Sequence, residues 1–317
     1  MAVFTVIEST ALEAWLEGAQ VGELLGFEGI AAGIENTNYF VDTRHGRWVL
    51  TLFERMQATQ IDFCLRLMQR LADAGLPCPG PQIRRDGTLQ ATLAGRPAAL
   101  VRRLPGRSVD TPNPEQCRAI GHTLARMHLA AQDLPNALAN PRGLSWCLQT
   151  GALLHDHLAP GQASLLQEEL AVQQAFARGS VFATLPRGPV HADLFRDNAL
   201  FEQDTLSGIF DFYFAGADTW MFDLAVTCND WCIEDASGAF DPPRLKALLA
   251  GYCAIREPEP QEHEAWPTLL RAAALRFWIS RLADWHLPRP AHLLAPKDPG
   301  HFERILRLRR SQITRIV

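Results

Sequence analysis

Lysine is almost missing from this sequence. Among its 317 residues only Lys246 and Lys297 are lysines, so the first 245 residues contain none. The net charge is −5 and the pI is near 6.1. A surface that binds nucleic acid needs a clustered excess of basic residues, and these values give no support for one. We therefore expect no nucleic-acid partner for this chain.

Long apolar runs and paired cysteines are missing too. No apolar run reaches the roughly 18 residues that span a bilayer, and residues 1–17 contain no basic segment of the kind that opens a signal peptide. The seven cysteines are scattered and include no C-x-x-C pair. We expect them to be reduced, buried thiols rather than metal ligands or disulfides. The sequence thus predicts a cytoplasmic protein without a membrane partner.

The order of β-like and helical patterns divides the chain into two lobes. Strands are expected within residues 26–42, 47–53, 90–93 and 97–103, and helices from Thr10 and over residues 59–74. This order predicts a small α+β lobe over residues 1–103. Leu104-Pro105-Gly106 interrupts the pattern and predicts a hinge near residues 100–107. Residues 104–317 should form a mainly helical lobe, with helices at 114–131, 161–177, 218–234, 241–255, 261–285 and 298–310.

The clearest chemical pattern lies in the second lobe. His191, Asp193 and Asn198 fit H-x-D-x-x-x-x-N, and Asp211 follows thirteen residues after Asn198, at the end of a β-like run. In kinases with this pattern the first Asp accepts the proton of the acceptor hydroxyl, while the Asn and the second Asp hold Mg²⁺ on ATP. Ala192 stands where protein kinases carry arginine. The pattern therefore predicts an ATP-dependent kinase with a non-protein substrate.

The residues of this pattern have distinct expected roles. Asp193 should orient the acceptor hydroxyl and take its proton, whereas His191 should brace the loop. Asp223, on an expected helix, should accept hydrogen bonds from the backbone of this loop. The structural alternative is that two solvated turns carry acids by chance, and the joint spacing of Asp193, Asn198 and Asp211 disfavours it.

A small polar turn lies between two β-like runs at residues 33–40. Its backbone N–H groups and the side chains of Asn36, Thr37 and Asn38 can contact phosphate oxygens without a cation. We expect a loop that covers phosphates here. A plain hairpin turn is the structural alternative.

With these motifs the chain resembles the aminoglycoside-phosphotransferase-like kinases, and within them the homoserine kinases of the kinase-like type. The shared segments are Gly33, 36–40, 48–54, 104–106, 191–198, 212–215 and 223–225, within residues 5–235. The resemblance implies a two-lobed, protein-kinase-like fold of the α+β class, ATP with Mg²⁺, and phosphorylation of L-homoserine to O-phospho-L-homoserine for threonine biosynthesis. It also implies nucleotide-binding roles for Gly33, Asn36, Thr37, Asn38, Thr51, Val101 and Arg103.

One departure concerns the lysine that contacts the α- and β-phosphates in protein kinases. No lysine precedes Lys246, and Thr51 lies at the corresponding strand position, with Gln60 and Asp62 as the nearest candidates for the helix acid. Two explanations remain open. In the first, the chain is a non-catalytic, kinase-like ATP-binding regulator. In the second, the Thr51 hydroxyl forms a hydrogen bond to a phosphate, and an arginine or the metal supplies the positive charge. The complete set of residues in the second lobe favours the active enzyme.

The acceptor pocket has several candidate residues. Homoserine carries a carboxylate and an ammonium, so its pocket needs an arginine and an acid or carbonyl. The candidates are Arg196, Tyr213, Asp230, Trp231 and Glu234, with Arg142 as a further one, and surface ion pairs or core contacts are their structural alternative. Choline, methylthioribose and aminoglycoside kinases remain alternative assignments. A tryptophan cage would suit choline, but the spacing of Trp278 and Trp285 favours core packing.

Overall fold

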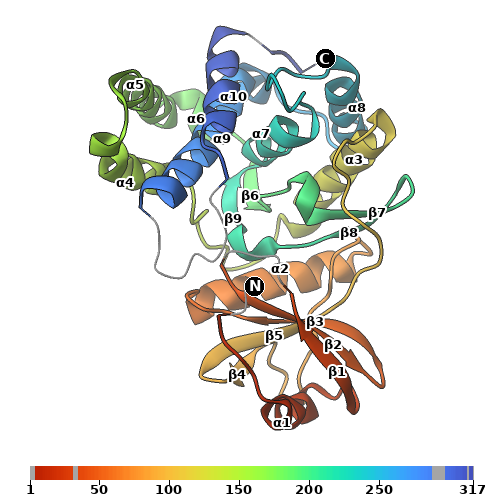
Figure 1. Cartoon of the computed structure of the whole chain (residues 1–317). Coiled ribbons are helices and arrows are strands. Elements are labelled where there is room, and N and C mark those ends of the chain that lie inside the picture. Colours follow the sequence, from red (N-terminus) through yellow and green to blue (C-terminus); the bar gives the residue numbers. More distant parts are fainter. Residues whose placement is uncertain (1–3, 31–34, 288–296, 313, 317) are drawn as a thin grey trace. The chain divides into compact units, whose positions relative to one another are not determined.

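The computed structural model describes residues 4–30, 35–287, 297–312 and 314–316. Of these, the residues up to Pro105 form one compact unit and those from Gly106 onward form a second. No helix in the described ranges is long and apolar enough to cross a membrane. The small sheet-rich part and the larger helical part that the sequence predicts are both present (Figure 1).

The first unit is built on an antiparallel sheet of five strands in the order β1-β2-β3-β5-β4. Its elements are α1 (Ser9–Ala19), β1 (Leu24–Gly29), β2 (Thr37–Thr43), β3 (Gly46–Leu52), α2 (Ala58–Asp73), β4 (Ala91–Leu93) and β5 (Arg96–Arg102). Figure 1 shows α1 and α2 on opposite sides of this sheet. Because side chains alternate along a strand, Trp48, Leu50 and Leu52 of β3 join one buried cluster with Trp15 of α1. Thr51 therefore belongs to the opposite face.

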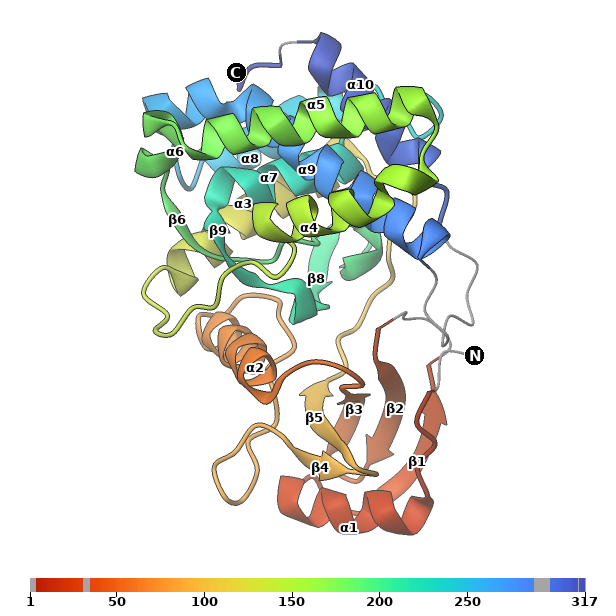
Figure 2. The same cartoon turned by 90° about the vertical axis from the view of Figure 1, so that its left-hand side faces the viewer.

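The second unit contains two short antiparallel sheets and the remaining helices. Strand β6 (Arg187–Val190) pairs with β9 (Gly216–Thr219), and β7 (Ala199–Glu202) pairs with β8 (Thr205–Ile209). The helices are α3 (Pro114–Ala131), α4 (Leu144–Leu154), α5 (Pro160–Ala177), α6 (Ser180–Thr184), α7 (Trp220–Trp231), α8 (Pro242–Cys253), α9 (Pro260–His286) and α10 (Gly300–Ser311), and 3₁₀ turns cover His155–His157, Arg196–Asn198 and Phe212–Phe214. Helix α9 packs against α4, α5, α7 and α10 (Figure 2).

The structure differs from the sequence predictions in several elements. Helix α1 begins at Ser9 rather than Thr10, and no side chain caps its first turn. The helix expected at 218–234 is shorter, since residues 216–219 pair with β6 as strand β9. Helix α4 was not predicted, because no side chain caps its first turn. The core placement of Trp285 was wrong: it is 52% exposed, whereas Trp278 is fully buried.

Gly106 lies at the start of the second unit with a φ of 103°. A Cβ atom there would lie 2.8 Å from the carbonyl oxygen of Phe201 and would overlap the hydroxyl of Ser207. Arg107 and Phe201 exchange backbone hydrogen bonds of 3.0 and 2.9 Å, so this segment has little freedom to shift. We expect Gly106→Ala to lower the free energy of unfolding by about 1–3 kcal/mol in urea denaturation. Gly161→Ala is the control, because a Cβ at Gly161 meets nothing within 4 Å. Equal unfolding free energies for both variants would contradict this explanation.

Candidate active site

One buried carboxylate fixes the loop that follows β6. Asp223, on α7, is fully buried and accepts the backbone N–H of His191 at 2.8 Å and that of Ala192 at 2.7 Å. Its Oδ2 also lies 3.1 Å from Nε2 of His128. These bonds confirm the predicted structural role of Asp223. They hold Ala192 at a φ of 62°, a left-handed conformation that costs a non-glycine residue about 1–2 kcal/mol.

His191 connects this loop to the segment after β8. Its Nε2 lies 3.0 Å from the carbonyl oxygen of Phe210, and its Nδ1 accepts the N–H of Asp193 at 3.3 Å. Because a carbonyl oxygen can only accept, Nε2 carries the proton and the imidazole is neutral. Burial lowers the pKa of His191, although the carboxylates of Asp223 and Asp193 oppose that shift. Both ring nitrogens thus contact the backbone, so His191 links the loop after β6 to the segment after β8.

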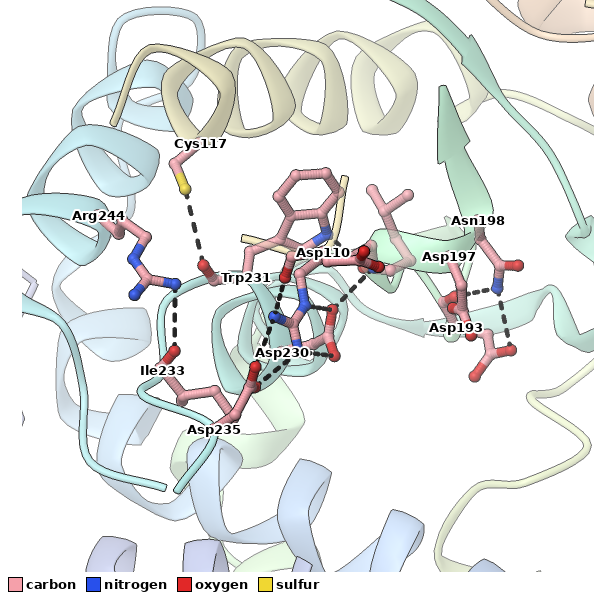
Figure 3. Close-up of polar contacts among 12 residues, drawn as sticks. Asp110, Cys117, Asp193, Asp197, Asn198, Asp230, Trp231, Ile233, Asp235 and Arg244 are labelled. Atoms are coloured by element: carbon pink, nitrogen blue, oxygen red, sulfur yellow. Dashed lines mark hydrogen bonds and ion pairs between the residues drawn. The ribbon is translucent and has the colours of Figure 1, made fainter. Parts of the chain in front are cut away.

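Asn198 and Asp211 lie at the same end of the hairpin formed by β7 and β8. The N–H of Phe210 donates to the carbonyl oxygen of Asn198 at 3.0 Å, and Asp211 is the next residue. Nδ2 of Asn198 donates to the carbonyl oxygen of Asp193 at 2.8 Å and lies 3.3 Å from its Oδ2 (Figure 3). The amide nitrogen therefore faces Asp193, and the amide oxygen Oδ1 of Asn198 faces away from it.

This pair of side chains fits a hard divalent cation. An amide oxygen and a carboxylate are ligands that Mg²⁺ prefers. Asp211 has a φ of 65°, a left-handed conformation that Asp adopts more readily than most residues and that is common at functional sites. Within the described ranges, no group of three or more His, Cys, Asp or Glu side chains could hold a metal ion. A cation at Asn198 and Asp211 would thus also bind phosphate oxygens and water.

Asp193 lies beside an arginine that the motif did not indicate. Nη1 of Arg276, on α9, is 3.6 Å from Oδ1 of Asp193, and the two side chains are 4% and 17% exposed. Burial raises the pKa of Asp193, and the charge of Arg276 opposes that rise. Burial lowers the pKa of Arg276 to about 10, so its guanidinium stays charged at neutral pH. In the sequence Arg276 is the charged residue of the apolar run 272–279, which marks it as unusual but does not connect it with Asp193.

The substrate candidates Arg196 and Asp230 belong to one ion-pair network at the end of the loop. The backbone N–H of Arg196 donates to Asp230 at 2.7 Å, and its guanidinium contacts Asp230 at 3.2 Å and Asp235 at 2.9 Å. It also donates to the carbonyl oxygen of Asp110 at 2.6 Å. Figure 3 shows Asp110, Asp230 and Asp235 converging on this network. Burial would lower the pKa of Arg196, but the two carboxylates raise it above its ordinary value. Arg196 therefore joins the end of the loop to α7.

The other substrate candidates differ in exposure. Trp231 is fully buried, and its Nε1 donates to the carbonyl oxygen of Leu194 at 3.1 Å. Glu234 is exposed and accepts a hydrogen bond from Ser237 at 3.1 Å. Tyr213 is half-buried in the 3₁₀ turn after Asp211. The structure thus does not bring all five candidates together.

A pocket of about 370 Å³ lies within the second unit. Its lining includes Arg196 and Asp230, together with Asp235, Arg281 and Lys297. This volume is within the range of about 300–1,000 Å³ that is usual for small-molecule sites. Side chains of both charge signs suit a small zwitterion.

The expected nucleotide-binding residues lie in the first unit. Thr51 and Asn38 are opposite each other on β3 and β2, and the Thr51 hydroxyl donates to Oδ1 of Asn38 at 2.8 Å. Thr37 is fully buried. Asn36 and Val101 are buried as well. Cζ of Arg103 lies 3.8 Å from the ring centroid of Phe40. Gly33 is outside the described residues. Their roles at a nucleotide remain predictions.

Comparisons with known proteins agree with this architecture. Residues 26–266 match the phosphotransferase enzyme family. The homoserine kinase of Janthinobacterium sp. (strain Marseille) is 48% identical over 314 residues, which cover 99% of this chain and 98% of that protein. The homoserine kinase of Cupriavidus necator is 49% identical over 318 residues, covering 98% and 96%. Among solved structures, an amicoumacin kinase in complex with AMP-PNP and Ca²⁺ matches with a TM-score of 0.70 at 17% identity, covering 94% of this chain and 91% of that one.

The chain belongs to the phosphotransferase enzyme family. The predicted kinase-like fold and the prediction of an ATP-dependent small-molecule kinase are thereby confirmed. The more specific resemblance is confirmed as well, because homoserine kinases at 48–49% identity align over nearly its whole length. The family implies ATP and a divalent cation, of which Mg²⁺ is the usual one.

Proposed function

We propose that this chain phosphorylates the hydroxyl of L-homoserine with ATP and so produces O-phospho-L-homoserine for threonine biosynthesis. The observation that carries this choice of acceptor is the 48% identity, over 99% of the chain, with a protein named homoserine kinase. A cytoplasmic location goes with this proposal. The seven cysteines are free thiols, as is usual in a reducing compartment.

Asp193 is the proposed base of the transfer. The acceptor hydroxyl oxygen forms a bond to the γ-phosphorus, and the bond from that phosphorus to the β,γ-bridging oxygen breaks, so that ADP leaves. The hydroxyl proton passes to the Asp193 carboxylate. The amide of Asn198 orients this carboxylate, and His191 braces the loop that carries it. The pKa of Asp193, raised by burial, suits a group that must accept a proton.

Asn198 and Asp211 are the proposed Mg²⁺ ligands. When bound, the cation neutralises charge on the β- and γ-phosphates. The first unit contains no lysine that could share this work. There the Thr51 hydroxyl and the amide of Asn38 would contact phosphate oxygens, with Asn36, Thr37, Val101 and Arg103 as further proposed nucleotide contacts. The acceptor hydroxyl would contact Asp193, while Arg196 and Asp230 would hold the end of the loop that carries this base.

A coupled assay of ADP release tests this proposal. The acceptors are L-homoserine, choline, methylthioribose and an aminoglycoside, each with ATP and Mg²⁺. We expect ADP release to require L-homoserine. A higher kcat/KM for another acceptor would reassign the substrate, and ATP binding without ADP release for any acceptor would favour a non-catalytic regulator.

A further inference from the structure

Arg276 is a buried arginine with few polar partners among the residues that the structure describes. It is 3% exposed, and its Nε has no hydrogen-bond partner among the residues that the structure describes. The carboxylate of Asp193 lies 3.6 Å from its Nη1, an ion-pair distance that is too long for a hydrogen bond. A guanidinium carries several N–H donors, and leaving buried donors unpaired is costly. Arg276 therefore has hydrogen-bonding capacity beyond what Asp193 uses.

Aromatic rings and other cations surround this guanidinium. Its Cζ lies 3.8 Å from the ring centroid of Phe277 and 5.4 Å from that of Phe214. Arg142 contacts the same Phe214 ring at 5.3 Å. The charges of Arg142 and Arg281 act to lower the pKa of Arg276, as expected from repulsion between like charges. An anion beside Arg276 would reduce this repulsion.

The two oxygens of Asp193 face different neighbours. Oδ2 lies 3.3 Å from the amide nitrogen of Asn198. Oδ1 faces Arg276. An acceptor whose hydroxyl contacts Asp193 therefore has Arg276 within reach of its other atoms. In extended homoserine, roughly 5 Å separates the hydroxyl oxygen from the carboxylate carbon, which is compatible with contacts to both residues.

We propose that Arg276 binds the carboxylate of the amino-acid acceptor and thereby selects amino acids over amino alcohols. This inference rests on the proposed function and deepens it. A planar guanidinium matches a carboxylate through two parallel N–H···O bonds. One of these bonds would use the Nε–H, which the described residues leave unpaired. Arg276 is thus a specificity-determining residue beside the base.

The test compares the wild type with Arg276→Met and Arg276→Lys on three acceptors. These are L-homoserine, 3-amino-1-propanol, which lacks the carboxylate, and 4-hydroxybutyrate, which lacks the ammonium. In Arg276→Met, kcat/KM for L-homoserine should fall about 100-fold or more relative to that for 3-amino-1-propanol, because one partner of a buried charge pair is lost. The value for 4-hydroxybutyrate should fall with that for L-homoserine. Arg276→Lys should restore part of the ratio, and the KM for ATP should change little.

Arg271→Met is the matched control on the same helix. Arg271 pairs with the buried Glu169 at 2.6 Å, so its loss should lower the melting temperature and leave the acceptor ratio unchanged. Competitive inhibition by L-2-aminobutyrate, which keeps the carboxylate and lacks the hydroxyl, gives a measurement without turnover. Its inhibition constant should rise in Arg276→Met and stay constant in Arg271→Met.

Two results would overturn the assignment of Arg276. One is an equal fall in the kcat/KM of Arg276→Met for L-homoserine and for 3-amino-1-propanol, which a purely structural role would give. The other is an unchanged inhibition constant for L-2-aminobutyrate together with a raised KM for ATP, which would place Arg276 at a phosphate. A wild-type protein that releases no ADP with L-homoserine would instead refute the proposed function, so the two failures are distinguishable.

Discussion

Replacing Asp193 with Asn is expected to lower kcat with L-homoserine by about 10²- to 10⁴-fold while ATP still binds. The amide keeps the shape of the side chain but cannot accept the hydroxyl proton. The neighbouring Asn198 and Asp211, which are the proposed metal ligands, are unchanged. Measurements of ADP release and of ATP affinity by calorimetry separate the loss of chemistry from a loss of binding.

Asp204→Asn is the control for this variant. Asp204 lies in the turn between β7 and β8, is exposed, and accepts a hydrogen bond from Asn113 at 2.8 Å. Its replacement should leave kcat within about twofold, since surface substitutions away from special features have small effects. Unchanged ADP release in Asp193→Asn would remove Asp193 from the role of base.

Replacing Asp223 with Ala is expected to lower the free energy of unfolding by about 3–5 kcal/mol. The change leaves the N–H groups of His191 and Ala192 buried without their acceptor, and it also removes a partner of His128. Urea denaturation measures the loss. Asp241→Ala is the comparison, because Asp241 caps α8 by accepting the N–H of Arg244 and pairs with the guanidinium of the same residue at 2.9 Å. Loss of such a cap and ion pair costs about 1–2 kcal/mol. A loss for Asp223→Ala no larger than for Asp241→Ala would contradict this account.

The effect of Asp223→Ala should also depend on pH. Burial alone would raise the pKa of Asp223, but hydrogen bonds and charge from His128, with a further contribution from His191, hold it below its ordinary value. The ionised carboxylate therefore stabilises the fold fully above the unfolded pKa of about 4, and this contribution is lost as the pH falls through the lower, folded pKa. The difference in unfolding free energy between the wild type and Asp223→Ala should be constant from about pH 5 to pH 8 and should shrink in more acidic solution. A difference that stays constant under acidic conditions would show that ionisation of Asp223 contributes nothing.

Elements with local signals could be predicted from the sequence. Helix α3 has the expected bounds because Asn113 and Gln116 form a capping box and Pro114 suits the first helical position. Helix α4 and strand β9 have no such signal. Strand β9 is extended because it pairs with β6, a partner that lies far from it in the sequence. The conformation of these segments depends on contacts with distant parts of the chain, which local sequence propensity does not indicate.

The same distinction applies to the candidate site. Asp193, Asn198 and Asp211 were identifiable because their spacing follows from one loop and one hairpin. Arg276 was not, because it approaches Asp193 only through the packing of α9 against its neighbours. Trp231 was named as a substrate candidate from its place on a helix, yet the structure buries it completely. Position on an element was predictable, whereas the direction of a side chain depended on the assembled core.

Helix α7 holds the loop of the proposed base at two points. Asp223 accepts N–H groups at the start of the loop, from His191 and Ala192, and Asp230 accepts the N–H of Arg196 at its end. The two carboxylates are seven residues apart, or about two helical turns, so they lie on the same side of the helix. Local opening of α7 would release both attachments together. In hydrogen exchange the amides of His191, Ala192 and Arg196 should therefore be protected to the same degree as those of α7, so that loop and helix open as one cooperative unit.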